Sequence, residues 1–294
     1  MHMIPALHWY YSVLRGSNNQ YIGRLIMNYE HTDSREINAL GDVNDFRHLM
    51  NDGFIQSVDS SPCYRITAIP FDLNPNAISL NDPNIKQLLF NPTHEHLRGF
   101  GVRGFLERET SQELNGIKGR NIGLDHGEII LQWNGYLEYR CPIFNSYFFW
   151  GKKLPQYADF EDLNWLYPLV VCEHPVSFLR LVRELYAAAG ITCPFVVMQE
   201  YHNLLWLSLP AGSPDFLSLV FCLDGAHRCG SWEPIVSDTK VYHPNFNPDQ
   251  TAYGLLKSVY AAFELSERDI PFFDESGNFS RDNNYRQSYR KTFN

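Results

Sequence analysis

Cys172, Glu173 and His174 place a thiol, a carboxylate and an imidazole at three consecutive positions, directly before Pro175. A nucleophilic cysteine needs a base within hydrogen-bonding reach, but adjacent side chains on a strand point to opposite faces. We therefore favour a structural interpretation of this stretch. LVVC is the end of a buried strand, Cys172 fills space in the core, and Pro175 begins a helix whose N-terminus is capped by a polar group.

Zinc binding is the second chemistry that these residues suggest. Cys172 and His174 could join a second pair of the same kind, His227 and Cys229. Each pair is separated by one residue, whereas paired ligands in structural zinc sites are usually separated by about two to five. We therefore expect no metal site and no cofactor.

Glu200 and His202 form another carboxylate and imidazole pair, in the sequence EYHN. On a strand, a spacing of two places both side chains on one face. If the fold brought Glu173 and His174 to them, the four residues could supply the general acid and base of a hydrolase or nuclease. A hydrogen-bonded histidine in a turn is the simpler explanation of His202.

GFGVRG at 99–104 has the glycine spacing of a dinucleotide-binding loop. That loop must follow a buried strand and begin a helix, so that the helix N-terminus receives the phosphate. The preceding segment, NPTHEHLR, is not a buried strand. We therefore attribute the spacing to chance.

The C-terminal tail interleaves cations with aromatic side chains, a pattern able to bind phosphate and stack on bases. Its candidate binding residues are Arg281, Tyr285, Arg286, Tyr289 and Arg290. The whole chain has 24 basic and 33 acidic residues and a net charge of −9, so its average field repels nucleic acid and anionic membranes. We expect the tail to dock on a protein partner, on another copy of the chain or on its own body.

Composition describes a folded globular protein: 294 residues, of which 44% are hydrophobic and 15% aromatic, are enough for a sizeable core. The six cysteines include no CxxC pair, which favours reduced thiols and a cytoplasmic location. No uninterrupted apolar run approaches the length of a membrane span, and we expect no membrane partner.

Local signals predict the elements that must position these residues. YRITAIPFDL is typical of an alternating strand that stops at Pro70, and Asp82 caps a short helix that ends at Asn91-Pro92. Asn134-Gly135 predicts a hairpin over 128–141 with a type I′ turn. PVSFLRLVRELYAAAG, which ends at Gly190, and NPDQTAYGLLKSVYAAFEL have helical periodicity.

Two further apolar stretches, PFVVMQEYHNLLWLSLP and FLSLVFCLDG, have the composition of strands. Together the elements predict an α+β fold, a mostly antiparallel sheet flanked by helices. We place a boundary in the polar stretch GKKLPQYADFEDLN. It separates a β-rich half, 61–160, from an α/β half, 161–275, with an N-terminal segment of uncertain affiliation, 1–60, and a polar tail, 276–294.

Several strings resemble a known region: YRITAIPFDLNP, GFGVR, NGYLEYRCPI, LYPLVVCEHPVSFLRLVRELYAAAGI and VMQEYHNLLWL. Together, over residues 60–275, they look like the region that follows an AlbA-type, Schlafen-like DNA-binding domain in uncharacterised bacterial proteins. The resemblance implies a role in antiviral defence or another DNA-linked system. The first 60 residues lack the acidic strand pattern and the Ala-Asn-rich, Gly-Gly turn of the AlbA-type domain, so its nuclease activity is not carried over to any residue here.

We therefore expect a non-catalytic, cytoplasmic recognition module that senses a ligand or binds a partner. A protein partner or an oligomer of the chain itself is favoured over nucleic acid. The alternative is a nucleic-acid-processing hydrolase or nuclease, whose catalytic residues would be Glu173, His174, Glu200 and His202.

Overall fold

A computed structural model describes residues 61–72, 74, 76–92, 101–122, 127–144, 148, 165–211, 227–241, 243 and 245–280. The predictions for 1–60, for the boundary segment 151–164, for the strand FLSLVFCLDG and for the tail residues from Arg281 onward lie outside these residues.

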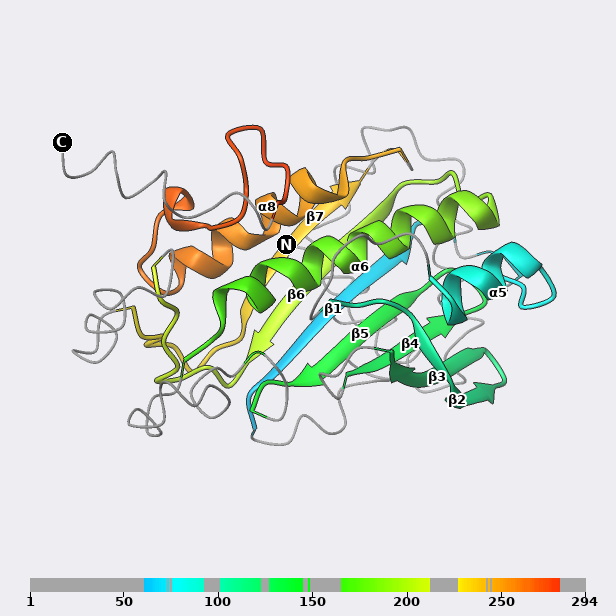
Figure 1. Cartoon of the computed structure of the whole chain (residues 1–294), viewed down its shortest axis with the longest axis horizontal. Coiled ribbons are helices and arrows are strands. Elements are labelled where there is room, and N and C mark those ends of the chain that lie inside the picture. The colour runs from blue at the N-terminus through cyan, green and yellow to red at the C-terminus, as the bar shows by residue number, and fades with distance from the viewer. Residues whose placement is uncertain are drawn as a thin grey trace, which may run out of the picture.

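The described part of the chain forms a seven-stranded antiparallel sheet in the order β2-β3-β4-β5-β1-β6-β7, flanked by three α-helices. In Figure 1, α6 and α8 cross one face of the sheet and α5 lies beside α6. This confirms the α+β prediction. The elements are β1 (Cys63–Pro70), α5 (Pro83–Phe90), β2 (Phe105–Glu113), β3 (Gly116–Asn121), β4 (Glu128–Gln132), β5 (Leu137–Pro142), α6 (Pro168–Ala189), β6 (Phe195–His202), β7 (Ile235–Val241), α8 (Pro248–Ala261) and the short 3₁₀ helix η2 (Glu267–Asp269).

β1 lies inside the sheet, between β5 and β6. The predicted strand and its end at Pro70 are confirmed, but its side chains are buried on both faces instead of alternating between core and solvent. Tyr64 and Ile66 belong to the core under the helices, while Arg65 and Thr67 are buried on the other face. Because β1 pairs with β6 over its whole length, strands from 61–160 and from 161–275 share one sheet.

The predicted hairpin is confirmed as β4 and β5, but its turn is not of type I′. Gly135 has φ 91°, whereas Asn134 is not among the residues with positive φ. The Gly135 N–H donates to Gln132 O at 3.0 Å, and Asn134 Oδ1 accepts from the Tyr136 N–H at 3.0 Å. An Asx hydrogen bond followed by a left-handed glycine therefore replaces the two left-handed residues of a type I′ turn.

Two of the predicted helices are confirmed: α5 with both of its boundaries, and α8, which ends at Ala261, with its N-terminal boundary. The Asp82 side chain caps α5 by accepting from the Asn84 N–H at 2.8 Å, and Pro83 occupies the first turn. The helix predicted within NPDQTAYGLLKSVYAAFEL is α8, which is capped by Asn247.

α6 corrects the interpretation of the VCEHP stretch. The helix begins at Pro168, two turns before Pro175, so LVVC is helical and not the end of a strand. Proline has no N–H and interrupts the helical hydrogen bonds. Nearby side chains bond to the carbonyl groups of this turn: His174 Nδ1 donates to Val170 O at 3.0 Å, and the Ser177 hydroxyl to Glu173 O at 2.8 Å. The end of the helix at Gly190, with φ 69°, is as predicted.

Residues 101–104 of the GFGVRG stretch pack between α5 and α6 and do not form a phosphate-binding loop. It precedes β2 instead of beginning a helix. The Val102 N–H donates to Ser177 Oγ on α6 at 2.8 Å, and a Cβ on Gly101 would lie 2.4 Å from that oxygen. Gly104, with φ 151°, lies against Leu89 O of α5. Close packing explains these two glycines, and their resemblance to a dinucleotide-binding loop carries no function.

Gly101→Ala is expected to lower the free energy of unfolding by about 1–3 kcal/mol, because the added methyl group must displace Ser177 from α6. Gly230→Ala is the matched control, since a Cβ there meets nothing within 4 Å. Denaturant unfolding of the two variants checks the prediction, and equal stability would contradict this account of the Gly101 contact.

Candidate functional site

His174, one of the four candidate catalytic residues, lies in the core between α6 and the sheet. Its side chain is fully buried, and its ring centroid lies 4.5 Å from that of Phe148 and 5.8 Å from that of Tyr64. Because a carbonyl can only accept, Nδ1 carries the hydrogen donated to Val170 O at 3.0 Å, and Nε2 lies 3.2 Å from the Tyr139 hydroxyl oxygen. Glu173 is also fully buried. These contacts hold α6 against β5.

Glu200 and His202 lie on the opposite face of the sheet. Tyr201, between them, points toward the helices, where its ring lies 4.9 Å from that of Tyr64. The side chains on either side of Tyr201 must therefore point away from the helices. The predicted shared face of Glu200 and His202 is observed, with His202 Nε2 3.7 Å from Glu200 Oε2. The structure does not bring this pair together with Glu173 and His174, because the sheet separates them.

A row of charged side chains crosses the face of the sheet that carries Glu200. Opposite residues in the ladder bring Glu128, Arg140, Arg65 and Glu200 side by side on β4, β5, β1 and β6. Arg65 Nε lies 2.5 Å from Glu200 Oε2, and Arg140 Nε donates to Glu128 at 2.8 Å. The Arg65–Glu200 pair is buried. No sequence motif marks this row, because it depends on which strands are neighbours and in what register.

Ion pairing controls the protonation of Glu200. Burial alone would raise the pKa of its carboxyl group, but the neighbouring His202 imidazole and the positive charge of Arg65 outweigh burial and hold the pKa below its ordinary value. The carboxylate is therefore ionised near neutral pH and bound to a buried guanidinium group. This ion pair stabilises the sheet. Because Glu200 is ionised, it has no proton to donate near neutral pH.

Cys172 is fully buried on α6, with its sulfur 3.6 Å from the Tyr260 hydroxyl of α8. Burial raises the pKa of the thiol well above its usual range, more than the hydrogen bond with Tyr260 lowers it. A buried, protonated thiol is a poor nucleophile. Among the described residues, no three His, Cys, Asp or Glu side chains are grouped so that they could hold a metal ion.

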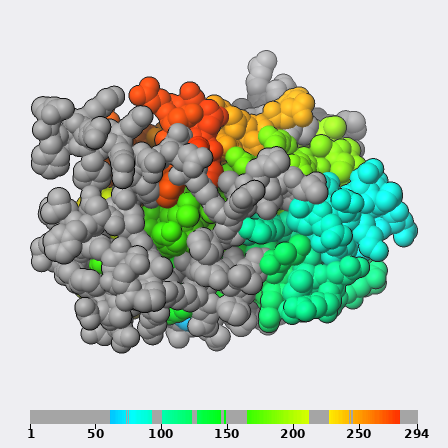
Figure 2. Space-filling view, viewed as in Figure 1, coloured from blue at the N-terminus to red at the C-terminus, as the bar shows by residue number. Residues whose placement is uncertain are grey.

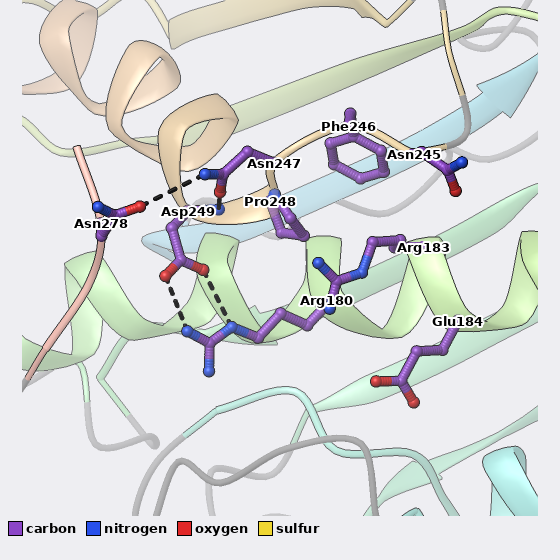
Figure 3. Close-up of a pocket in the computed structure, with 9 residues that line it drawn as sticks. All are labelled: Arg180, Arg183, Glu184, Asn245, Phe246, Asn247, Pro248, Asp249 and Asn278. Carbon is purple, nitrogen blue, oxygen red and sulfur yellow. Dashed lines mark hydrogen bonds and ion pairs between the residues drawn. The ribbon is translucent and has the colours of Figure 1, made fainter. Parts of the chain in front are cut away.

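An open polar cleft with a volume of about 600 Å³ lies between α6 and the start of α8 (Figure 3). One wall comes from α6 and the other from the loop that leads into α8. The lining residues are Arg180, Arg183, Glu184, Asn245, Phe246, Asn247, Pro248, Asp249 and Asn278. Sequence analysis missed this cleft, because its walls come from segments more than 60 residues apart in the chain.

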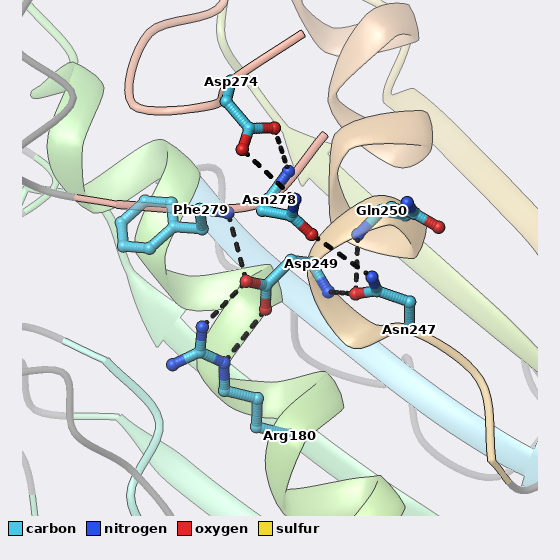
Figure 4. Close-up of polar contacts among 7 residues, drawn as sticks. All are labelled: Arg180, Asn247, Asp249, Gln250, Asp274, Asn278 and Phe279. Carbon is cyan, nitrogen blue, oxygen red and sulfur yellow. Dashed lines mark hydrogen bonds and ion pairs between the residues drawn. The ribbon is translucent and has the colours of Figure 1, made fainter. Parts of the chain in front are cut away.

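Polar contacts fix one end of the cleft (Figure 4). Arg180 donates to both carboxylate oxygens of Asp249, at 3.0 and 2.8 Å, and Asp249 also accepts from the Phe279 N–H at 3.1 Å. Asn247 caps α8 and contacts Asn278 at 3.4 Å. In the space-filling view, the segment after α8 (red) meets the surface of α6 (green) (Figure 2).

Arg183 and Glu184 give the cleft charges of both signs. They follow Arg180 on α6, and both are partly exposed. Asn245 adds an exposed amide, and the ring of Phe246 is held 5.3 Å from that of Phe195. The cleft therefore has one end that is fixed by the Arg180–Asp249 ion pair, and it exposes hydrogen-bonding groups and charges of both signs.

The comparisons with known proteins found no matching family model, no matching curated protein and no matching solved structure. None of the described helices is both long enough and apolar enough to cross a membrane. The fold and the cleft are therefore the observations on which a function can be argued.

Glu200→Gln is expected to lower the free energy of unfolding by about 3–5 kcal/mol near neutral pH, because it leaves Arg65 buried without its carboxylate. Glu267→Gln is the matched control, because its ion pair with Lys257 is exposed and its loss should change little. Unfolding in denaturant measures both variants.

The Arg65–Glu200 ion pair also makes the stability of the protein depend on pH. The folded-state pKa of Glu200 lies below its ordinary value of 4.5. Its contribution to stability is therefore complete above pH 4.5 and is lost as the pH falls through the folded-state value. Denaturation measured as a function of pH should show a smaller acid loss in Glu200→Gln than in the native chain. Parallel curves would contradict the pairing.

Cys172 should react with a thiol reagent more slowly than the partly exposed Cys193 in the folded protein, because it is buried and its pKa is raised. Both should react rapidly after unfolding. Cys172→Ala should cost about 1–2 kcal/mol of stability through lost packing. Mass spectrometry of labelled peptides follows each cysteine, and fast native labelling of Cys172 would contradict its closed environment.

Proposed function

We propose that the chain is a non-catalytic recognition module that binds a protein partner in the cleft between α6 and α8. The observation that carries the proposal is the cleft itself. It has a volume of about 600 Å³, one end is fixed by the Arg180–Asp249 ion pair, and polar groups line it. By contrast, Glu173 and His174 are closed inside the core, and Glu200 is bound to Arg65 on the other side of the sheet.

The charges of the cleft favour a protein segment over nucleic acid. Asp249 neutralises Arg180, and Glu184 stands next to Arg183, so the surface offers both signs of charge instead of a basic track. The net charge of −9 adds a repulsive field for polyanions. A peptide with both donors and acceptors, and an apolar side chain to contact Phe246, fits this lining.

We also propose that the protein is cytoplasmic and that it has a role in a bacterial defence system or another DNA-linked system. The location rests on the absence of CxxC pairs among the cysteines. The defence role rests on the resemblance of residues 60–275 to the region that follows AlbA-type, Schlafen-like domains.

Exchange of the two charges in the cleft tests the proposal. Arg183→Glu combined with Glu184→Lys should remove a specific protein partner that the native chain captures from cell extract, with at least about a ten-fold loss of affinity for the purified partner. Arg108→Glu is the control, because it changes an exposed arginine on β2 and should leave capture unchanged.

A catalytic function would give a different result. Metal-dependent cleavage of labelled DNA or RNA by the native chain, lost in a Glu200→Gln variant that remains folded, would overturn the proposal. Equal capture of the partner by the native chain and by the charge-exchanged variant would place the binding surface elsewhere.

A further inference from the structure

Three buried polar side chains lie on β6 and β7, on the side of the sheet that faces the helices. Gln199 and Tyr201 are fully buried, and Ser237 is 6% exposed. Within the part of the chain that the structure describes, both polar atoms of the Gln199 amide and the hydroxyl groups of Tyr201 and Ser237 have no hydrogen-bond partner. Because buried polar groups are nearly always paired with protein or with ordered water, these atoms point to a ligand.

Strand pairing places the three side chains next to one another. Gln199 and Ser237 are directly opposite in the β6–β7 ladder, and facing residues of antiparallel strands point to the same side of the sheet. Tyr201 follows Gln199 by two residues and so shares that side. Its ring lies 4.9 Å from that of Tyr64, in the core under the helices. The unpaired groups therefore belong to one patch of the core.

The helices cover this patch, and each of them adds a polar group. α6 and α8 cross the sheet on this side (Figure 1). Cys172 of α6 and Tyr260 of α8 are fully buried, with the sulfur 3.6 Å from the hydroxyl oxygen. Burial raises the pKa of the Tyr201 hydroxyl well above its ordinary value, and the nearby Cys172 thiol raises it further. The five side chains therefore form one polar core cluster between α6, α8 and the sheet.

The unpaired groups of the polar core cluster cannot fully satisfy one another. Burial raises the pKa of Tyr201 and the nearby Gln199 side chain partly opposes this rise, but the two side chains do not form a hydrogen bond. A glutamine amide can donate two hydrogen bonds and accept two. If the hydroxyl groups of Tyr201 and Ser237 both turned toward Gln199, they would therefore fill about half of its capacity.

We infer that the polar core cluster binds ordered water, and that at least one water molecule connects Gln199 on β6 to Ser237 on β7. A buried water typically makes about three hydrogen bonds to polar groups that are otherwise unpaired. The cluster consists of an amide, hydroxyl groups and a thiol, which offer both donors and acceptors. A charged ligand would be buried here without an opposite charge from these five side chains, at a high cost, whereas water needs none.

A crystal structure of the whole chain, at a resolution that shows ordered water, tests the inference directly. It should contain a water oxygen within about 3.2 Å of both the Gln199 amide and the Ser237 hydroxyl. A direct hydrogen bond between these two side chains, with no water beside them, would overturn the inference. A larger molecule held between them would overturn the assignment of water.

Gln199→Met gives an independent test, because it keeps a similar shape and removes the polar atoms. If water binds the amide, the variant loses those hydrogen bonds and leaves Ser237 with fewer partners. The midpoint of thermal unfolding should then fall by about 2–8 °C. If the amide has no partner in the native protein, its removal relieves a cost, and the midpoint should rise. An unchanged or raised midpoint contradicts the water site.

Ser237→Ala and the double variant with Gln199→Met test whether the two side chains share one water. Each single substitution should lower the midpoint, and the double variant should lose less than both single losses together, because the same water is removed. Additive losses would show that the two groups do not share a ligand. Ser258→Ala, at an exposed position of α8, is the control and should leave the midpoint unchanged. The inference does not rest on the cleft, which none of the five side chains of the polar core cluster lines.

Discussion

Helix α6 contains Pro175 in a turn that is buried in the core, and the packing of the neighbouring elements depends on the polar contacts of this turn. A proline in the middle of a buried helix removes one hydrogen bond, and the polar backbone groups around it have no water to replace it. Around Pro175, side chains also bond to carbonyl groups of the helix: His174 donates to Val170 O and Ser177 donates to Glu173 O. Ser177 in turn receives the Val102 N–H, which brings Gly101 against the helix, and His174 reaches Tyr139 on β5. The same few polar contacts thus position the helix, the segment before β2 and the centre of the sheet.

Elements with local signals could be predicted from the sequence. Asp82 and Pro83 begin α5, Gly190 ends α6, and Gly135 turns the β4–β5 hairpin because each residue acts on backbone within one turn of itself. The start of α6 could not be predicted in the same way. Pro175 has the sequence signature of a first helical residue. The preceding LVV is an apolar run in which Val170 and Val171 are buried and Leu169 is partly buried, and a buried strand would have the same composition.

Less of the candidate site could be predicted from the sequence. Strand alternation correctly placed Glu200 and His202 on one face, since this depends only on a period of two. It could not show that Arg65 is the neighbour of Glu200, because that contact depends on the pairing of β1 with β6. The cleft depends on the packing of α6 against the start of α8, where Arg180 meets Asp249. Such long-range contacts leave no periodic pattern in one chain.

The central position of β1 also determines an order of assembly during synthesis. β1 leaves the ribosome before its partner β6, which follows only after about 130 further residues and on the order of ten seconds at ordinary translation rates. In that interval the β4–β5 hairpin can form from local contacts and can bind one side of β1. Among the described elements, no other strand covers the second side of β1 until β6 arrives. A nascent chain with this topology is most vulnerable to aggregation in that interval, and a chaperone that shields β1 would act there.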